Sequence, residues 1–122
     1  MGYRSDVKYV MQFESDEKCA EFGAVMKVKD AIYAEAIQGW DVKGDRVYFH
    51  AEDWKWYSGS FPIVDAHEKL LDECVSFGGA YYFIRLGEND DDCDQRYSYS
   101  EDDSIEPPWD AIAYHRYTEF EY

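Results

Sequence analysis

Carboxylates are the side chains with the clearest capacity for chemistry, and they are concentrated between Glu88 and Asp110. Carboxylates at alternate positions bind Ca²⁺ in a loop whose sixth residue is glycine and whose twelfth is glutamate. Counted from Asp90, the twelfth residue is Glu101, but the sixth is Gln95. The spacing therefore disfavours a calcium site and is more typical of a solvated acidic loop.

The histidines give no sign of a metal or catalytic site. His50, His67 and His115 are too far apart in sequence to match a metal-binding motif, and none lies near a cysteine. The sequence also has no nucleophile-elbow serine motif and no phosphate-binding glycine loop. A cysteine and a histidine that meet only in the folded chain stay possible. We expect no metal, no cofactor and no catalytic residue, and hence a protein that is not an enzyme.

Cysteine usage and the apolar segments predict a cytoplasmic protein. Cys19, Cys74 and Cys93 are widely spaced and odd in number, which is typical of reduced thiols rather than of a disulfide framework. No apolar stretch approaches the roughly 20 residues that span a bilayer. The first ten residues also lack the charged and then apolar order of a signal peptide.

Acidic charge is the dominant property of the composition. The chain has 27 acidic and 12 basic side chains, for a net charge of −15. Residues 87–122 hold 12 of the acidic and 2 of the basic side chains, so two-thirds of the excess lies in the last 36 residues. Such a field repels nucleic acids and anionic membranes and attracts basic protein surfaces. We expect neither direct nucleic-acid binding nor membrane binding.

The acidic segment is therefore the candidate partner-binding site. Its carboxylates are interleaved with tyrosine and tryptophan, which are typical anchor residues of protein interfaces. A folded carboxylate array can occupy a site that normally binds phosphates. The alternative is a loop that only keeps the protein soluble. The candidate partner-binding residues are Glu88, Asp90, Asp91, Asp92, Asp94, Tyr97, Tyr99, Glu101, Asp102, Asp103, Glu106, Trp109 and Asp110.

Local patterns predict the elements that precede this segment. Alternating apolar residues predict a strand over residues 3–13, and Ser15 is placed to cap a helix that ends near Lys29. Residues 32–42 fit either a continued helix or a strand. The turn at residues 43–45 predicts a hairpin, and a β-bulge at Glu52 and Asp53 would turn Trp54 and Trp56 toward the core.

The second half begins with the most clearly predicted element. Pro62 suits the first turn of a helix, and the glycines at positions 78 and 79 predict its end. A buried strand over Ala80–Leu86, an acidic insert at about 88–110 and a last strand over Ala111–Phe120 follow. The order predicts one α+β domain over residues 1–122, a ferredoxin-like split β-α-β sandwich. In that fold a mainly antiparallel sheet carries two helices on one face, here with an extra C-terminal strand.

Three short segments resemble a known group of proteins. GYRSDVKYV at Gly2–Val10, WKWY at Trp54–Tyr57 and FIRLGE at Phe83–Glu88 are similar to segments of small acidic proteins of tailed bacteriophages and prophages. That group has no known activity to carry over to particular residues. The resemblance implies a phage accessory protein made in the bacterial cytoplasm, where small acidic proteins bind and block host machinery.

Three functions remain open at this point. The first is a DNA-mimic-like inhibitor whose acidic segment blocks a basic, nucleic-acid-binding site on a host protein, such as a defence protein. The second is a small-ligand or nucleotide-binding module around Trp54, Trp56 and His50. The third is a homo-oligomeric structural protein, such as a homodimer, paired through an edge strand at residues 111–120.

Overall fold

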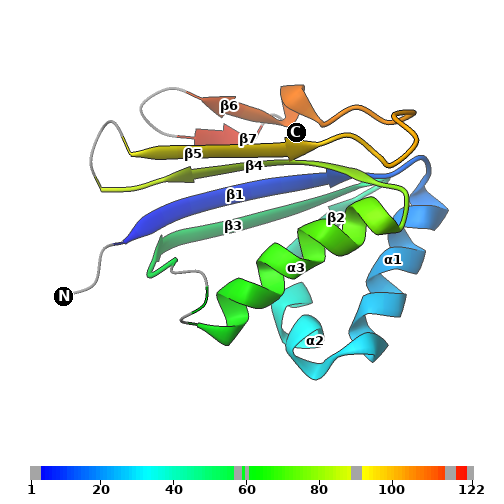
Figure 1. Cartoon of the computed structure of the whole chain (residues 1–122), viewed down its shortest axis with the longest axis horizontal. Helices are drawn as coiled ribbons and strands as arrows, with labels where there is room; N and C mark the ends of the chain where they lie inside the picture. The colour runs from blue at the N-terminus through cyan, green and yellow to red at the C-terminus, as the bar shows by residue number, and fades with distance from the viewer. Residues whose placement is uncertain (1–3, 57–58, 60, 89–91, 115–117, 121–122) are drawn as a thin grey trace.

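A five-stranded antiparallel sheet with three helices forms the body of the protein (Figure 1). The computed structural model describes residues 4–56, 59, 61–88, 92–114 and 118–120. The elements are β1 (Ser5–Gln12), α1 (Asp16–Lys29), α2 (Ala31–Ile37), β2 (Trp40–Lys43), β3 (Arg46–Trp54), α3 (Pro62–Ser76), β4 (Ala80–Leu86), β5 (Cys93–Ser98), the short 3₁₀ helix η1 (Trp109–Ala111), β6 (Ile112–Tyr114) and β7 (Thr118–Phe120).

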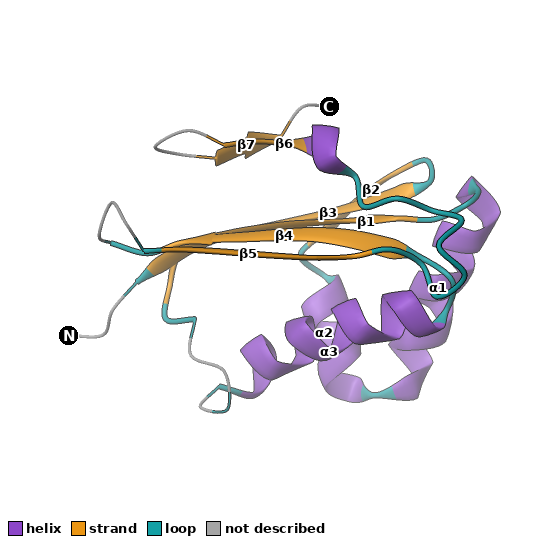
Figure 2. Ribbon diagram, turned by 45° about the horizontal axis from the view of Figure 1, so that its top comes forward, coloured by secondary structure: helices purple, strands orange, loops and turns teal. Residues whose placement is uncertain are grey.

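The sheet is the middle one of three layers. Its strand order is β2-β3-β1-β4-β5, and every neighbouring pair is antiparallel. The three helices lie on one face, whereas η1 and the β6–β7 hairpin lie over the other (Figure 2). β1 is the central strand, so Tyr9 packs in the core under the helices and Val10 in the smaller core on the opposite face.

The predicted start of the first helix is confirmed, but the prediction of two helices is wrong. The side chain of Ser15 accepts a hydrogen bond from the Lys18 N–H, as an N-cap does. Asp30 then adopts an extended conformation that ends α1, and its carboxylate accepts the N–H of Ile32 to begin α2. The ambiguous segment 32–42 is therefore mostly a third helix, followed by strand β2.

The predicted bulge in β3 is confirmed. Ser5 pairs with Trp54 and Val7 with Ala51, so β3 has one more residue than β1 between these two pairs. Asp53 lies in this bulge and has a φ of 59°, a left-handed conformation that few side chains adopt readily. Trp56 consequently enters the core, where its side chain is only 6% exposed.

The predicted helix at Pro62 is confirmed as α3, and two glycines end it. Gly78 has a φ of 99°, which suits a residue without a Cβ. A Cβ at Gly79 would lie 2.7 Å from the Cys74 sulfur and 2.9 Å from the ring of Phe13. The chain can therefore pass closely from α3 into β4 only with glycine at this position.

The structure of the C-terminal third differs from the predicted acidic insert and single last strand. The acidic insert at 88–110 contains β5, which pairs along its whole length with β4. The single last strand over 111–120 is instead η1 followed by β6 and β7, which pair with each other in a separate two-stranded sheet. None of the helices in the described part of the chain is both long enough and apolar enough to span a membrane.

Candidate functional site

Strand β5 divides the acidic segment into two clusters at opposite ends of the sheet (Figure 1). One cluster lies at the start of β5, around Cys93, and the other follows Ser98, so most of the six residues of β5 lie between them. Extended chain rises about 3.4 Å per residue, so the clusters are separated by roughly 20 Å. The candidate residues therefore do not form one continuous patch, and each end of β5 must be considered separately.

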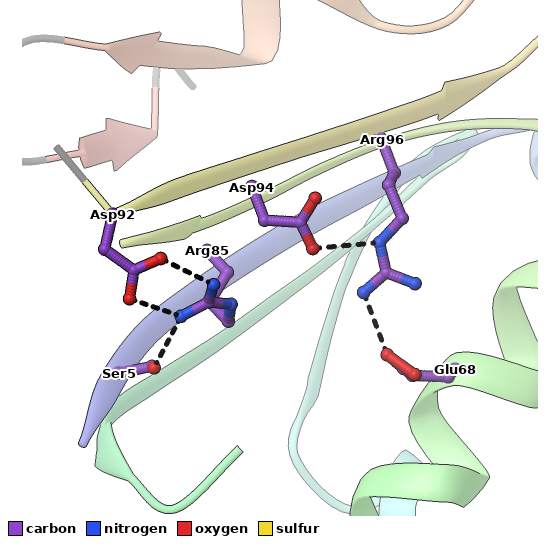
Figure 3. Close-up of polar contacts among 6 residues, drawn as sticks. All are labelled: Ser5, Glu68, Arg85, Asp92, Asp94 and Arg96. Atoms are coloured by element: carbon purple, nitrogen blue, oxygen red, sulfur yellow. Dashed lines mark hydrogen bonds and ion pairs between the residues drawn. The ribbon is translucent and has the colours of Figure 1, made fainter. Parts of the chain in front are cut away.

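At the start of β5, an ion pair and hydrogen bonds connect the described carboxylates to the body of the protein (Figure 3). Asp92 accepts two hydrogen bonds from the Arg85 guanidinium, at 2.9 and 3.3 Å, and Arg85 also donates to the Ser5 hydroxyl. Glu88 accepts the backbone N–H of Arg4 at 2.7 Å. These contacts connect the β4–β5 turn to β1, so the carboxylates here have a structural role.

Arg96 makes the equivalent connection between β5 and α3 (Figure 3). Its terminal nitrogen donates to Glu68 at 2.8 Å, and its guanidinium lies 4.0 Å from the centre of the Phe83 ring. Its Nε is 3.4 Å from the Asp94 carboxylate, which is an ion pair without a hydrogen bond. Asp94 and Glu68 thus share one cation. Asp90 and Asp91, the other predicted members of this cluster, lie outside the described residues.

At the end of β5, hydrogen bonds order the acidic loop around Asp102. One oxygen of its carboxylate accepts hydrogen bonds from the N–H and hydroxyl of Ser104 and from the hydroxyl of Ser100. The bonds from Ser104, and then that from Ser100, lower the pKa of Asp102 to about 2. The Ser100 N–H also donates to the carbonyl of Ile105. The loop is therefore closed by its own side chains.

Most carboxylates of this loop have no cationic partner. Glu101, Asp103 and Glu106 are exposed, and none of them forms an ion pair with a residue that the structure describes. Asp110 is the exception, because it pairs with Arg46 at 3.1 Å, but its side chain is still 76% exposed. The negative charge at this end of β5 is consequently available to a partner.

Three large aromatic side chains are exposed beside this loop. The exposed fractions are 56% for Tyr97, 43% for Trp109 and 38% for Tyr99. Tyr97 and Trp109 meet edge to face with ring centres 4.7 Å apart, and Trp109 also contacts Tyr82, which is largely buried. The aromatic anchors proposed from sequence are thus at the surface, and packing on Tyr82 fixes the position of Trp109.

The fold adds residues that sequence reasoning missed. A hollow of about 320 Å³ lies where the acidic loop meets the ends of β1 and α3, and Glu14 and Phe77 line it beside Glu101 and Asp102. Lys18, also at this hollow, lies with its ammonium 5.5 Å from the centre of the Phe77 ring. Only the sheet pairing brings Glu14 near the loop.

We call the following set the acidic–aromatic surface: Glu14, Tyr97, Tyr99, Glu101, Asp102, Asp103, Glu106, Trp109 and Asp110.

His67 is a buried core residue whose ring is hydrogen-bonded. Its Nδ1 is hydrogen-bonded to the Tyr9 hydroxyl at 2.7 Å, and that hydroxyl accepts the Trp40 indole N–H at 2.8 Å. Burial lowers the pKa of His67 to about 4, so the ring is neutral at pH 7. This arrangement gives the His67 ring a structural role in the core.

The proposed pocket of Trp54, Trp56 and His50 does not form around these three side chains. Trp54 and Trp56 are in ring contact on the helix side of the sheet, 6.1 Å apart. His50 alternates with Phe49 and Ala51, which face the helices, so its side chain lies on the opposite face. The tryptophans are mainly core residues, although Trp54 is only partly buried.

The buried thiols are not activated nucleophiles. Burial raises the pKa of Cys19 to about 11, and it raises the pKa of Cys74 even further. Both cysteines are therefore protonated at neutral pH. In the described part of the chain, no three histidine, cysteine, aspartate or glutamate side chains are grouped closely enough to hold a metal ion.

Comparison with protein families, with curated proteins and with solved structures finds no match to this chain.

Proposed function

We propose that this protein is a non-enzymatic binding protein that uses its acidic–aromatic surface to block a basic, nucleic-acid-binding site on another protein. One observation supports this most strongly. The exposed edge-to-face pair of Tyr97 and Trp109 is packed against the sheet beside carboxylates that have no cation of their own. Aromatic anchors next to uncompensated charge suit an interface, whereas a purely solubilising loop would need only the charge.

The ordering of the loop strengthens this proposal. Immobilising a flexible segment upon binding costs about 1–2 kcal/mol per residue in backbone entropy. The bonds of Asp102 to Ser100 and Ser104 already hold the loop in one conformation. A rigid row of carboxylates can replace phosphates in a basic groove, and its charge speeds the association of the two proteins. The proposal is thus a DNA-mimic-like inhibitor.

The setting of this function is also a proposal. The resemblance to phage proteins supports a phage-encoded protein in the bacterial cytoplasm, and the partner would be a basic host protein, such as a defence nuclease.

For the fold, the strand order β2-β3-β1-β4 with a helical connection after β1 and after β3 supports a ferredoxin-like arrangement. Strand β5 and the C-terminal hairpin are additions to it.

Capture experiments with duplex DNA as competitor test the proposal. The tagged protein is incubated with bacterial lysate at low salt, and retained proteins are eluted either with duplex DNA or with high salt. We expect a nucleic-acid-binding protein in both eluates, because DNA and the carboxylates compete for one site. The double variant Tyr97→Ala and Trp109→Ala should not retain it.

A charge-matched control separates this surface from general acidity. Changing Glu101, Asp103 and Glu106 to the corresponding amides removes three charges from the acidic–aromatic surface. Changing Glu21, Glu35 and Asp72 to amides removes three exposed charges from the helices instead. Equal losses of binding in the two variants, or failure of DNA to elute the captured protein, would contradict the proposal.

A further inference from the structure

The hollow beside the acidic loop is formed by segments that are far apart in sequence. The start of α1, the end of α3 and the loop after β5 meet there, at one end of the sheet (Figure 1). The hollow has a volume of about 320 Å³, and the structure describes every residue that lines it. Its charged lining residues are Glu14, Lys18, Glu101 and Asp102.

The lining of this hollow has an excess of negative charge. Its three carboxylates, those of Glu14, Glu101 and Asp102, face a single cation, that of Lys18, so the net charge is −2. Glu14 and Glu101 are exposed and form no ion pair with a residue that the structure describes. The hydrogen bonds to Asp102 come from serines, which do not cancel its charge.

The charged groups around the hollow increase this excess. Asp16 and Glu17 form the first turn of α1, and Asp103 continues the acidic loop. Arg46, at the start of β3, does not line the hollow and is paired with Asp110 at 3.1 Å. The surroundings therefore favour a cation in the hollow and disfavour an anion.

The C-terminal end of α3 also favours a cation. The helix ends at Ser76 and is capped by Phe77, and its last turn contains no basic residue. The C-terminal end of a helix carries a partial negative charge, which is stabilised by a nearby cation. Ser76, Phe77 and Gly78 line the hollow, so this end of α3 forms part of its wall.

The ring of Phe77 is the aromatic part of this wall. Its position is fixed by Phe22, whose ring centre lies 5.3 Å away. The ammonium of Lys18 lies 5.5 Å from the centre of the Phe77 ring, which is within the range of a cation–π interaction. A cation of the chain itself thus already lies at this ring. Lys18 is exposed and forms no ion pair with a described residue, so another cation can displace it.

We propose that the hollow receives an arginine side chain of the partner, with the guanidinium against Phe77 and its N–H groups toward Glu14 and Glu101. A guanidinium is planar, stacks on aromatic rings and donates in pairs to carboxylates, whereas an ammonium is a compact and strongly hydrated charge. Lys18 is then an internal competitor for the same position. The inference rests on the proposed function for its partner, because basic side chains supply the phosphate contacts of nucleic-acid-binding sites.

Titration with N-acetyl-arginine amide, followed by NMR of the backbone amides of the isotope-labelled protein, tests the hollow without the partner. We expect saturable shifts at Gly78 and Ser104, which line the hollow, and none on α2. N-acetyl-citrulline amide, which has a similar shape without the charge, should bind at least about five-fold more weakly. No saturable shift with the arginine probe, or equal affinity for the citrulline probe, would overturn the proposal.

Lys18→Gln gives the most specific test, because the proposal makes this lysine a competitor. The change should strengthen the binding of N-acetyl-arginine amide by about two- to five-fold. Lys27→Gln removes an equal charge from another exposed position on α1 and should leave the affinity unchanged. Equal strengthening by both changes would mean that only the overall charge of the protein matters, and the assigned site would then be wrong.

A matched pair of glutamates locates the guanidinium. Glu14→Gln should weaken the arginine probe by about two- to five-fold. Glu21→Gln removes an equal charge from an exposed position on α1 and should not. Equal effects of the two changes would count against the hollow.

The captured partner separates this inference from the function on which it rests. Lys18→Gln should bind the partner about two- to five-fold more tightly, and Glu14→Gln more weakly by a similar factor. If duplex DNA elutes the partner but neither change alters its affinity, the arginine site is wrong and the proposed function stands. If the arginine probe binds as expected but DNA elutes no partner, the hollow binds arginine and the proposed function is wrong.

Discussion

The two ends of β5 carry similar sequences of carboxylates but use them differently. At the start of the strand, Arg85 pairs with Asp92, and Arg96 pairs with both Asp94 and Glu68, which fixes the strand to β4 and α3. At its end, Glu101, Asp103 and Glu106 face solvent without a cation. Charge density in a sequence therefore does not identify a binding surface. The position of the few basic side chains decides which carboxylates stabilise the fold and which remain available.

The largest expected difference between the two ends of β5 is in the affinity for the partner. Replacing both Tyr97 and Trp109 by alanine should weaken partner binding by about 2–4 kcal/mol, because exposed aromatic anchors commonly contribute this much. Isothermal titration with the captured partner measures the change. Asp92→Asn, at the other end of β5, should leave the affinity within about two-fold, which corresponds to roughly 0.4 kcal/mol. A similar loss in both variants would remove the functional distinction between the two ends.

Acid should destabilise the core before it affects the loop at the end of β5. The pKa of His67 is lowered to about 4 from 6.5, so below pH 6.5 the unfolded chain binds the proton more readily than the folded chain. Stability therefore falls as pH decreases from 6.5 to 4, by up to about 3 kcal/mol at 1.36 kcal/mol per unit. Urea unfolding at several pH values measures this loss. His67→Gln should flatten the dependence between pH 6.5 and 4.

The same acid titration should leave the loop around Asp102 intact until a lower pH. The pKa of Asp102 is lowered to about 2 from 3.8, so its contribution is present above pH 3.8 and is lost as pH falls toward 2. The chemical shifts of Ser104 report on this carboxylate directly. If the loop signals change together with the core between pH 6.5 and 4, Asp102 does not hold the loop independently.

Sequence patterns predicted the elements that local chemistry determines. The N-cap at Ser15, the bulge at Asp53 and the helix from Pro62 each depend on a few neighbouring residues, and the structure confirms all three. β5 was missed, because its sequence CDQRYS has neither an apolar run nor a regular alternation. Its stability comes from pairing with β4 and from the Arg96–Glu68 contact, which a local pattern does not reveal.

For the candidate site, sequence indicated the residue types but not their grouping. Tyr97 and Trp109 were predicted as anchors, and they are exposed and in contact. The division into two clusters could not be predicted without β5, because it depends on which residues form that strand. Glu14 was missed for a related reason: it comes near Glu101 only when β1 and β5 lie in one sheet.

Arg96→Gln should give a moderate loss of stability. The change removes the pair with Glu68, the contact with Phe83 and the cation near Asp94. We expect a loss of about 1–2 kcal/mol, since both carboxylates still have some access to water. Urea unfolding measures it. An unchanged stability would show that β5 is held by its pairing with β4 alone.

The smallest expected effect lies at the other end of the strand and completes the comparison. Changing Glu101, Asp103 and Glu106 to amides should leave the free energy of unfolding within about 0.5 kcal/mol, because these side chains are exposed and form no ion pair with the described residues. Removing three negative charges from so acidic a chain also reduces charge repulsion, which favours the folded state slightly. A loss above about 1 kcal/mol would show that these carboxylates hold the fold, as those at the start of β5 do, and would count against their role as a free binding surface.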